Sequence, residues 1–97
     1  METREFYIAG FKHHEGMSII DELHENDELT LEPEPQNPYD PNAIKVLVTL
    51  DVADFMLGYV PRAISKDLKI TKNYHAFISE LNPSADPWLM VKVVVNF

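Results

Sequence analysis

Residues 34–46 read Glu-Pro-Gln-Asn-Pro-Tyr-Asp-Pro-Asn-Ala-Ile-Lys-Val. Together with Pro33, this segment places four prolines within nine residues, a density that excludes both a helix and a central strand. We therefore predict a shaped loop with fixed φ angles that then enters a strand. Because Asn37 and Asp40 each precede a proline, both are restricted to extended geometry. The loop should hold the ring of Tyr39 and the carboxylate of Asp40 side by side, unless Asp40 only caps its own turn.

On both sides of this loop, apolar residues recur at the spacings typical of strands and helices. Alternation of apolar and polar side chains, with β-branched and aromatic content, predicts six strands. These strands cover residues 5–11, 28–32, 43–50, 55–60, 74–81 and 88–97. Helical spacing predicts two helices, one over residues 17–25 with Ser18 as its N-cap and one over residues 62–70 after Pro61.

The resulting order is β-α-β-β-β-α-β-β, a mainly β chain with two short helices. So many short strands in 97 residues favour a small closed or partly closed barrel, because closure removes exposed sheet edges. The predicted core draws on both halves of the chain: Ile8, Leu31, Ile44, Val46, Leu68 and Val93.

Length and composition predict one globular domain over residues 1–97, with 45% hydrophobic and 25% charged residues. The absence of cysteine excludes disulfides and thiolate metal sites and fits a reducing compartment. The N-terminus carries acids instead of an apolar run, and no apolar stretch approaches the roughly 20 residues that a membrane span needs. We therefore expect a cytoplasmic protein, or a nuclear one if the source has a nucleus, that does not bind membranes.

The net charge is −8, and the acidic residues are unevenly placed. Residues 15–34 hold eight Asp and Glu and no Lys or Arg, whereas the remaining residues hold eight acids and all eight basic residues. Negative charge repels phosphate, so the overall composition argues against non-specific nucleic-acid binding. One face of the protein can still be acidic while another is neutral or locally basic.

Residues 35–46 resemble the signature of the HIRAN domain, Pro-x-Asn-Pro-Tyr-Asp-x-Asn-Ala-Ile-x-Val. Other pieces occur in the order of that family: Gly10-Phe11, a Gly16 loop and Leu29–Pro35 before it, and Leu57-Gly58-Tyr59-Val60-Pro61-Arg62 after it. The likeness is clearest from Phe6 to about Leu68. It implies a six-stranded, OB-like small barrel with Greek-key connections and two helices. In some members of the family it implies a module that captures the 3′ end of single-stranded DNA.

The resemblance also implies a pocket for that end. Tyr39 would stack on or flank the terminal nucleotide, and Asp40 would accept a hydrogen bond from its 3′-hydroxyl. Lys12 and His13 take the places of a basic residue and a tyrosine in eukaryotic members. Trp88 is the nearest match to the family's aromatic residue from a late loop.

Residues near the second predicted helix could extend this pocket. Tyr59 and Arg62 lie close to its N-terminus, which could help to hold phosphate. Four positive charges lie on or after that helix: Arg62, Lys66, Lys69 and Lys72. They form either a phosphate-tracking rim or an ordinary solvated helix face.

Catalytic and metal chemistry have weaker support. His13, His14 and Glu15 could join Asp40 in a metal site, but adjacent side chains on a strand point to opposite faces, so a solvated loop is expected instead. His13 and Asp40 could form an acid–base pair, yet the chain has no cysteine nucleophile, no serine elbow and no glycine-rich phosphate loop. We therefore predict a binding module, not an enzyme, without metal or cofactor.

Three functions remain open. The leading hypothesis is capture of single-stranded DNA 3′ ends by a set of residues around the loop: Lys12, His13, Tyr39, Asp40, Tyr59, Arg62 and Lys66. The first alternative is a protein-interaction module that uses the acidic stretch Glu15–Glu34 as its contact face. The second is an accessory domain of a DNA-processing nuclease or helicase.

Overall fold

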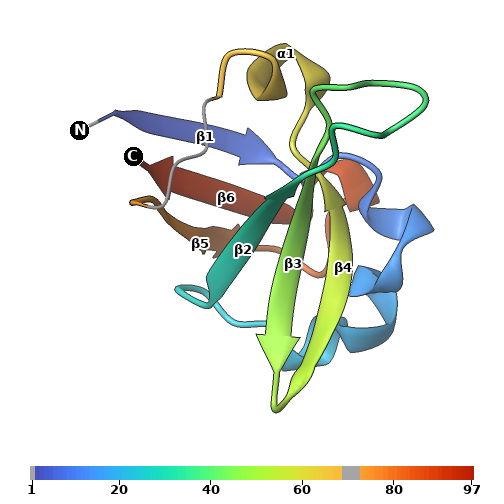
Figure 1. Cartoon of the computed structure of the whole chain (residues 1–97). Coiled ribbons are helices and arrows are strands. Elements are labelled where there is room, and N and C mark those ends of the chain that lie inside the picture. Colours follow the sequence, from blue (N-terminus) through green and yellow to red (C-terminus); the bar gives the residue numbers. More distant parts are fainter. Residues whose placement is uncertain (1, 69–72) are drawn as a thin grey trace.

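The computed structural model describes residues 2–68 and 73–97. Figure 1 shows its elements, which follow in chain order: strand β1 (Thr3–Tyr7), 3-10 helices η1 (Phe11–His13) and η2 (Glu15–Glu22), strands β2 (Glu28–Pro33), β3 (Ile44–Leu50) and β4 (Ala53–Tyr59), helix α1 (Arg62–Ser65), strand β5 (His75–Leu81), 3-10 helix η3 (Pro87–Leu89) and strand β6 (Val91–Asn96).

The six strands of the described residues form one antiparallel sheet in the order β1-β6-β5-β2-β3-β4. The sheet curls, so that β2, β3 and β4 lie in front of β1, β6 and β5 (Figure 1). Beyond the end of β1, Ala9 and Tyr59 exchange both backbone hydrogen bonds, at 2.8 and 2.9 Å. This bridge joins the two outer strands at one end, which removes part of the exposed edge. The mainly β, six-stranded prediction is confirmed.

The core lies between these two layers. β3 and β6 each bury alternate side chains over most of their length, as the alternation in their sequences predicts. The six predicted core residues are all at most 6% exposed: Ile8, Leu31, Ile44, Val46, Leu68 and Val93. They belong to one cluster of buried apolar side chains.

The first strand is shorter than predicted because the chain turns inward at Gly10. β1 ends at Tyr7, and Phe11 begins η1 instead of closing the strand. Gly10 has a φ of +71°, a left-handed conformation that glycine adopts readily. The ring of Phe11 is buried against Gly16 of η2. The last strand is shorter too, since Pro87 starts a helical turn before β6.

Both predicted helices are present in altered form. The first is the 3-10 helix η2, which begins at Glu15. Ser18 does not cap it, because its hydroxyl lies inside the helix and donates to the carbonyl oxygen of Glu15 at 2.7 Å. The second helix begins after Pro61, as predicted, but α1 ends at Ser65, and residues 69–70 lie outside the described residues. None of the helices formed by the described residues is long and apolar enough to cross a membrane.

Candidate functional site

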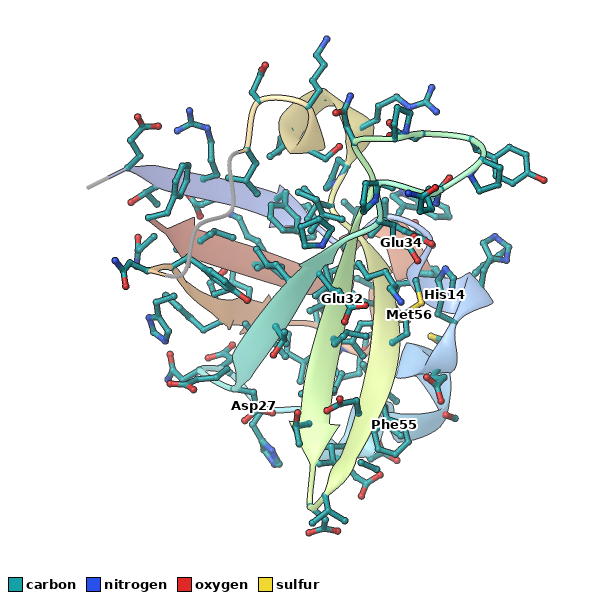
Figure 2. The ribbon with its side chains drawn as sticks, in the orientation of Figure 1. His14, Asp27, Glu32, Glu34, Phe55 and Met56 are labelled. Carbon is teal, nitrogen blue, oxygen red and sulfur yellow. The ribbon has the colours of Figure 1, made fainter. Side chains whose placement is uncertain are left out.

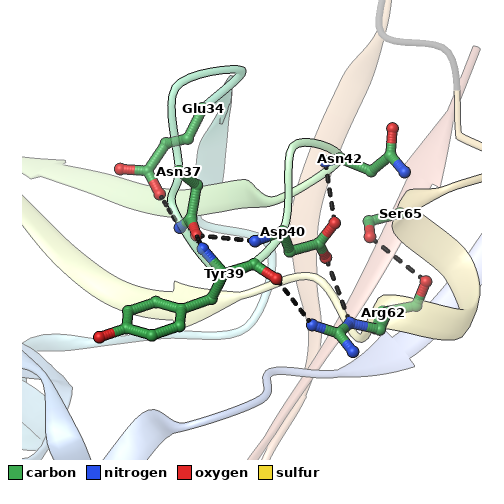
Figure 3. A network of polar contacts seen from close by, with 7 residues as sticks. All are labelled: Glu34, Asn37, Tyr39, Asp40, Asn42, Arg62 and Ser65. Atoms are coloured by element: carbon green, nitrogen blue, oxygen red, sulfur yellow. Dashed lines mark hydrogen bonds and ion pairs between the residues drawn. The ribbon is translucent and has the colours of Figure 1, made fainter.

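The loop between β2 and β3 is held by its own side chains (Figure 3). At its base, the N–H of Glu34 donates to the carbonyl oxygen of Ala43 at 2.8 Å. At its tip, Asn37 Oδ1 accepts the backbone N–H groups of Tyr39 and Asp40 at 2.8 and 3.0 Å. Because prolines restrict the φ angles and Asn37 satisfies the donors between them, the tip is held in one conformation.

Asp40 caps the turn with one oxygen and faces a cation with the other. Its Oδ1 accepts the backbone N–H of Asn42 at 2.9 Å, which is the turn contact considered as its alternative role. Its Oδ2 lies 3.4 Å from Nε of Arg62, whose Nη2 donates to the carbonyl oxygen of Tyr39 at 3.2 Å. The side chain of Asp40 is 18% exposed and that of Arg62 is 72% exposed. Arg62 therefore links the loop to α1 while it stays accessible to a ligand.

A cleft of about 310 Å³ lies between the loop tip and the end of β4. Its lining includes four predicted site residues: Tyr39, Asp40, Tyr59 and Arg62. The bridge between Ala9 and Tyr59 runs along the same cleft. Tyr39 is 88% exposed, and its ring extends away from the loop (Figure 3). The ring is available to stack on a planar ligand.

The other predicted site residues do not line this cleft. Lys66 lines a separate cavity of about 270 Å³, between the prolines of the loop and α1. Lys12 and His13 are exposed on η1. Trp88 is exposed on η3, which packs against η1. Two further predicted cations lie outside the described residues: Lys69 and Lys72.

His14, which is not among the predicted pocket residues, contacts one wall of the cleft. The ring of His14 packs edge-on against the ring of Tyr59, with centroids 5.7 Å apart and planes at 68°. Adjacent side chains on a strand point to opposite faces, but nothing in the local pattern says which of His13 and His14 meets β4. The end of η1 decides it, because the helix closes at His13 and His14 follows in extended geometry.

Glu34 is bonded to both sides of the cleft. Its Oε1 accepts the hydroxyl of Tyr59 at 2.8 Å and the side-chain N–H of Asn37 at 3.1 Å. Its Oε2 lies 3.4 Å from Nζ of Lys45, which is also 3.4 Å from a carboxylate oxygen of Glu32. The hydrogen bond from Tyr59, and next that from Asn37, lowers the pKa of Glu34, and the same bond to Glu34 raises the pKa of Tyr59.

From the sequence, Glu34 is predicted only as part of an acidic stretch. The sequence does contain one signal for the contact between Glu34 and Lys45. Glu34 is two residues from Glu32, which places both side chains on one face. Lys45 lies opposite Glu32 in the register of β2 and β3. Tyr59, by contrast, is 25 residues away along the chain. No local pattern predicts that contact.

The acidic stretch Glu15–Glu34 is partly used in internal contacts. Glu15 Oε1 accepts the backbone N–H of Met56 on β4 at 2.8 Å; Met56 is labelled in Figure 2. Asp27 Oδ2 accepts the backbone N–H of His24 at 2.9 Å. The two acids beside Lys45 are already paired. Several of these carboxylates thus satisfy the protein's own donors, which weakens the case for one continuous acidic contact face.

Among residues 2–68 and 73–97, no group of three His, Cys, Asp or Glu side chains is placed to hold a metal ion. Glu15, one of the ligands considered from the sequence, is bonded to a backbone N–H instead. The cleft brings together an exposed aromatic ring, a largely buried carboxylate and an accessible guanidinium. These are groups that bind and orient a ligand.

A comparison with known proteins found one matching family model and similar proteins. The family model of the HIRAN domain matches residues 1–79. A Fanconi-associated nuclease 1 homolog of Oryza sativa subsp. japonica is 44% identical over 61 residues, which are 63% of this chain and 6% of that protein. The crystal structure of the HIRAN domain of human HLTF superposes with a TM-score of 0.59 over 96% of this chain and 70% of that chain, at 16% identity. That last likeness concerns the fold alone.

Proposed function

The chain belongs to the HIRAN domain family, and from this membership we propose that it is a DNA-binding module that captures the 3′ end of single-stranded DNA. HIRAN domains are in general DNA-binding modules. The observation that carries the finer proposal is the convergence of Tyr39, Asp40 and Arg62 on one cleft. A strand end offers a base to stack, a phosphodiester to neutralise and a hydroxyl to recognise, and the cleft holds one group for each.

Tyr39 and Arg62 supply affinity in this scheme. Stacking on an exposed tyrosine tolerates every base, because each base has a π face. Arg62 meets the last phosphodiester, and a guanidinium can bond two phosphate oxygens at once. Lys12 and Lys66, which form no ion pair with any described residue, are the further cations that would contact phosphates. With so few cations on a chain of net charge −8, affinity should be weak.

Asp40 supplies selectivity for the end. A carboxylate has roughly four lone-pair sites, and described residues use two of them, one for Asn42 and one for Arg62. The remaining positions can accept a hydrogen bond from a 3′-hydroxyl. A 3′-phosphate cannot donate in the same way and brings further negative charge against the carboxylate.

The nuclease relative suggests a setting for such a module. Because the matched segment is only 6% of the nuclease homolog's length, nothing of that protein's activity is carried over. We propose that residues 1–97 form one binding domain without a catalytic residue of its own. Its role would then be to present DNA ends to a nuclease or helicase partner.

The test is a fluorescence-anisotropy titration with short single strands labelled at the 5′ end, one series ending in a 3′-hydroxyl and one in a 3′-phosphate. We expect the hydroxyl series to bind about ten- to a hundredfold more tightly, since a hydrogen bond to a charged group contributes about 1.5–3 kcal/mol. Equal binding of both series, or no binding at high micromolar protein, would rule out end capture. A protein-interaction role would then lead.

Tyr39→Ala should weaken all single strands alike, whatever their base composition, by about five- to a hundredfold, because one stacked base is worth about 1–3 kcal/mol. The side chain is 88% exposed, so the fold should not change. Tyr39→Phe is the matched control and should bind like the wild type, because it keeps the ring. Unchanged affinity in Tyr39→Ala would remove the ring from the site.

A further inference from the structure

We infer that Glu34 is a positioning residue, whose carboxylate sets the distance between Tyr59 and the loop tip and so holds the cleft open before any ligand arrives. The inference rests on the proposed function, since the cleft is the proposed DNA site. Glu34 itself does not line that cleft. Its effect would therefore pass through the residues that it bonds.

The contacts form a continuous path from the sheet to the loop tip. The hydroxyl of Tyr59, at the end of β4, donates to Glu34 Oε1 at 2.8 Å, and Asn37 Nδ2 donates to the same oxygen at 3.1 Å. Asn37 Oδ1 then accepts the backbone N–H groups of Tyr39 and Asp40 (Figure 3). One carboxylate oxygen thus connects a wall of the cleft to the backbone of the two residues proposed to read the DNA end.

The second oxygen of Glu34 keeps that carboxylate in place. It lies 3.4 Å from Nζ of Lys45, and the side chains of both residues are only 25% exposed. Lys45 is held on its other side by Glu32, whose side chain is 54% exposed. Glu32 lies on β2 and Glu34 follows the last residue of that strand; both are labelled in Figure 2. The lowered pKa of Glu34 keeps it ionised under ordinary conditions, so it stays an acceptor for both donors.

The prolines alone cannot fix the position of the loop tip relative to Tyr59. They fix φ angles inside the loop, but the loop meets the sheet at a narrow base, where Glu34 and Ala43 share one hydrogen bond. Apart from the contacts of the exposed Arg62 with Asp40 and Tyr39, nothing among the described residues at that base prevents a stiff loop from tilting as a unit. The bond from Glu34 to Tyr59 opposes that tilt, and preorganising a site in this way saves the cost of ordering it on binding.

The decisive variant is Glu34→Ala, with Glu32→Ala as its matched control. Both remove one carboxylate from Lys45 at 3.4 Å, but only Glu34 is bonded to Tyr59 and Asn37. We expect the affinity of Glu34→Ala for a single-stranded DNA with a 3′-hydroxyl to fall by on the order of tenfold. The side chains of Tyr39 and Asp40 must then be ordered each time a strand binds. Glu32→Ala, which leaves the bonds of Glu34 to Tyr59 and Asn37 in place, should weaken binding far less. Equal affinity of the folded Glu34→Ala protein and the wild type would overturn the inference.

A conservative variant separates positioning from charge. Glu34→Gln keeps an amide oxygen that can accept from both Tyr59 and Asn37, so it should retain most of the affinity. Its loss of charge should nevertheless lower the pKa of Tyr59 from its raised value, as followed by the ring-carbon NMR signal assigned with Tyr59→Phe. If Glu34→Gln binds as poorly as Glu34→Ala, the hydrogen bonds are not what matters and the inference fails.

A variant that removes a single hydroxyl covers the case in which Glu34→Ala does not fold. Tyr59→Phe keeps the ring and should weaken binding roughly three- to tenfold, the usual worth of one hydrogen bond. Unchanged affinity in Tyr59→Phe would overturn the inference. The NMR titration needs no DNA, so it separates the two claims. An unchanged pKa of Tyr59 in Glu34→Gln contradicts the positioning link itself. A changed pKa in a protein that binds no single strand contradicts only the proposed function.

Discussion

Asp40→Ala should abolish the preference for a free 3′ end. The wild type is expected to favour a 3′-hydroxyl over a 3′-phosphate by about ten- to a hundredfold, from the hydrogen bond that only the hydroxyl can donate to a largely buried carboxylate. In the variant that acceptor is gone. Paired anisotropy titrations of both strands, run on wild type and variant, measure the change in their ratio.

The contact between Asp40 and Arg62 leads to a second expected result for this variant. In the wild type its Nε lies 3.4 Å from Asp40 Oδ2, so part of its charge is already neutralised. Removal of the carboxylate frees the guanidinium for phosphate. Strands that end in a 3′-phosphate should then bind Asp40→Ala as well as, or better than, strands that end in a hydroxyl.

Asp54→Ala is the matched control. Asp54 is also an acid with one local hydrogen bond, from the hydroxyl of Thr49 at 2.6 Å, but it lies at the opposite end of β4 from Tyr59. It removes the same charge without touching the cleft, so the end preference should persist. If Asp40 only caps its turn through Asn42, Asp40→Ala will lower the unfolding midpoint and leave the ratio of affinities unchanged.

Gly58→Ala should cost about 3 kcal/mol or more of folding free energy. Gly58 has a φ of +147°, which residues with a Cβ rarely adopt. An added Cβ would also overlap the carbonyl oxygen of Ala9 and the side chain of Ile8. The carbonyl belongs to the bridge that joins the outer strands, so it cannot move without opening the barrel.

Chemical denaturation monitored by circular dichroism measures this loss, and Gly10→Ala is its control. Gly10 also has a positive φ, +71°, but an added Cβ would meet nothing closer than the ring of His14 at 3.7 Å. It should therefore cost only the backbone strain, about 1 kcal/mol. Because Tyr59 follows Gly58 directly, any folded Gly58→Ala protein should also bind single strands more weakly. Equal stability of the two variants would contradict the closure at Ala9.

Several features of this protein are determined by contiguous residues and could be predicted from them. Alternation along residues 43–50 and 88–97 identified strands and buried positions such as Val46 and Val93, because a period of two needs no distant partner. Four prolines within nine residues identified the shaped loop, since proline fixes φ wherever it stands. The neighbouring Tyr39 and Asp40 were expected on one loop, and both line the cleft.

Other features were decided only by the tertiary structure. The choice of His14 over His13 beside Tyr59 depends on where a 3-10 turn ends, and such short turns leave little periodic signal. The link from Glu34 to Tyr59, and the closure between Ala9 and Tyr59, join residues that are far apart in the chain. The first contact depends on the register of β2, β3 and β4, in which Lys45 lies opposite both Glu32 and Tyr59. The second exists because six strands curl until the outer two meet, and both are properties of the assembled sheet, which no local pattern of residues contains.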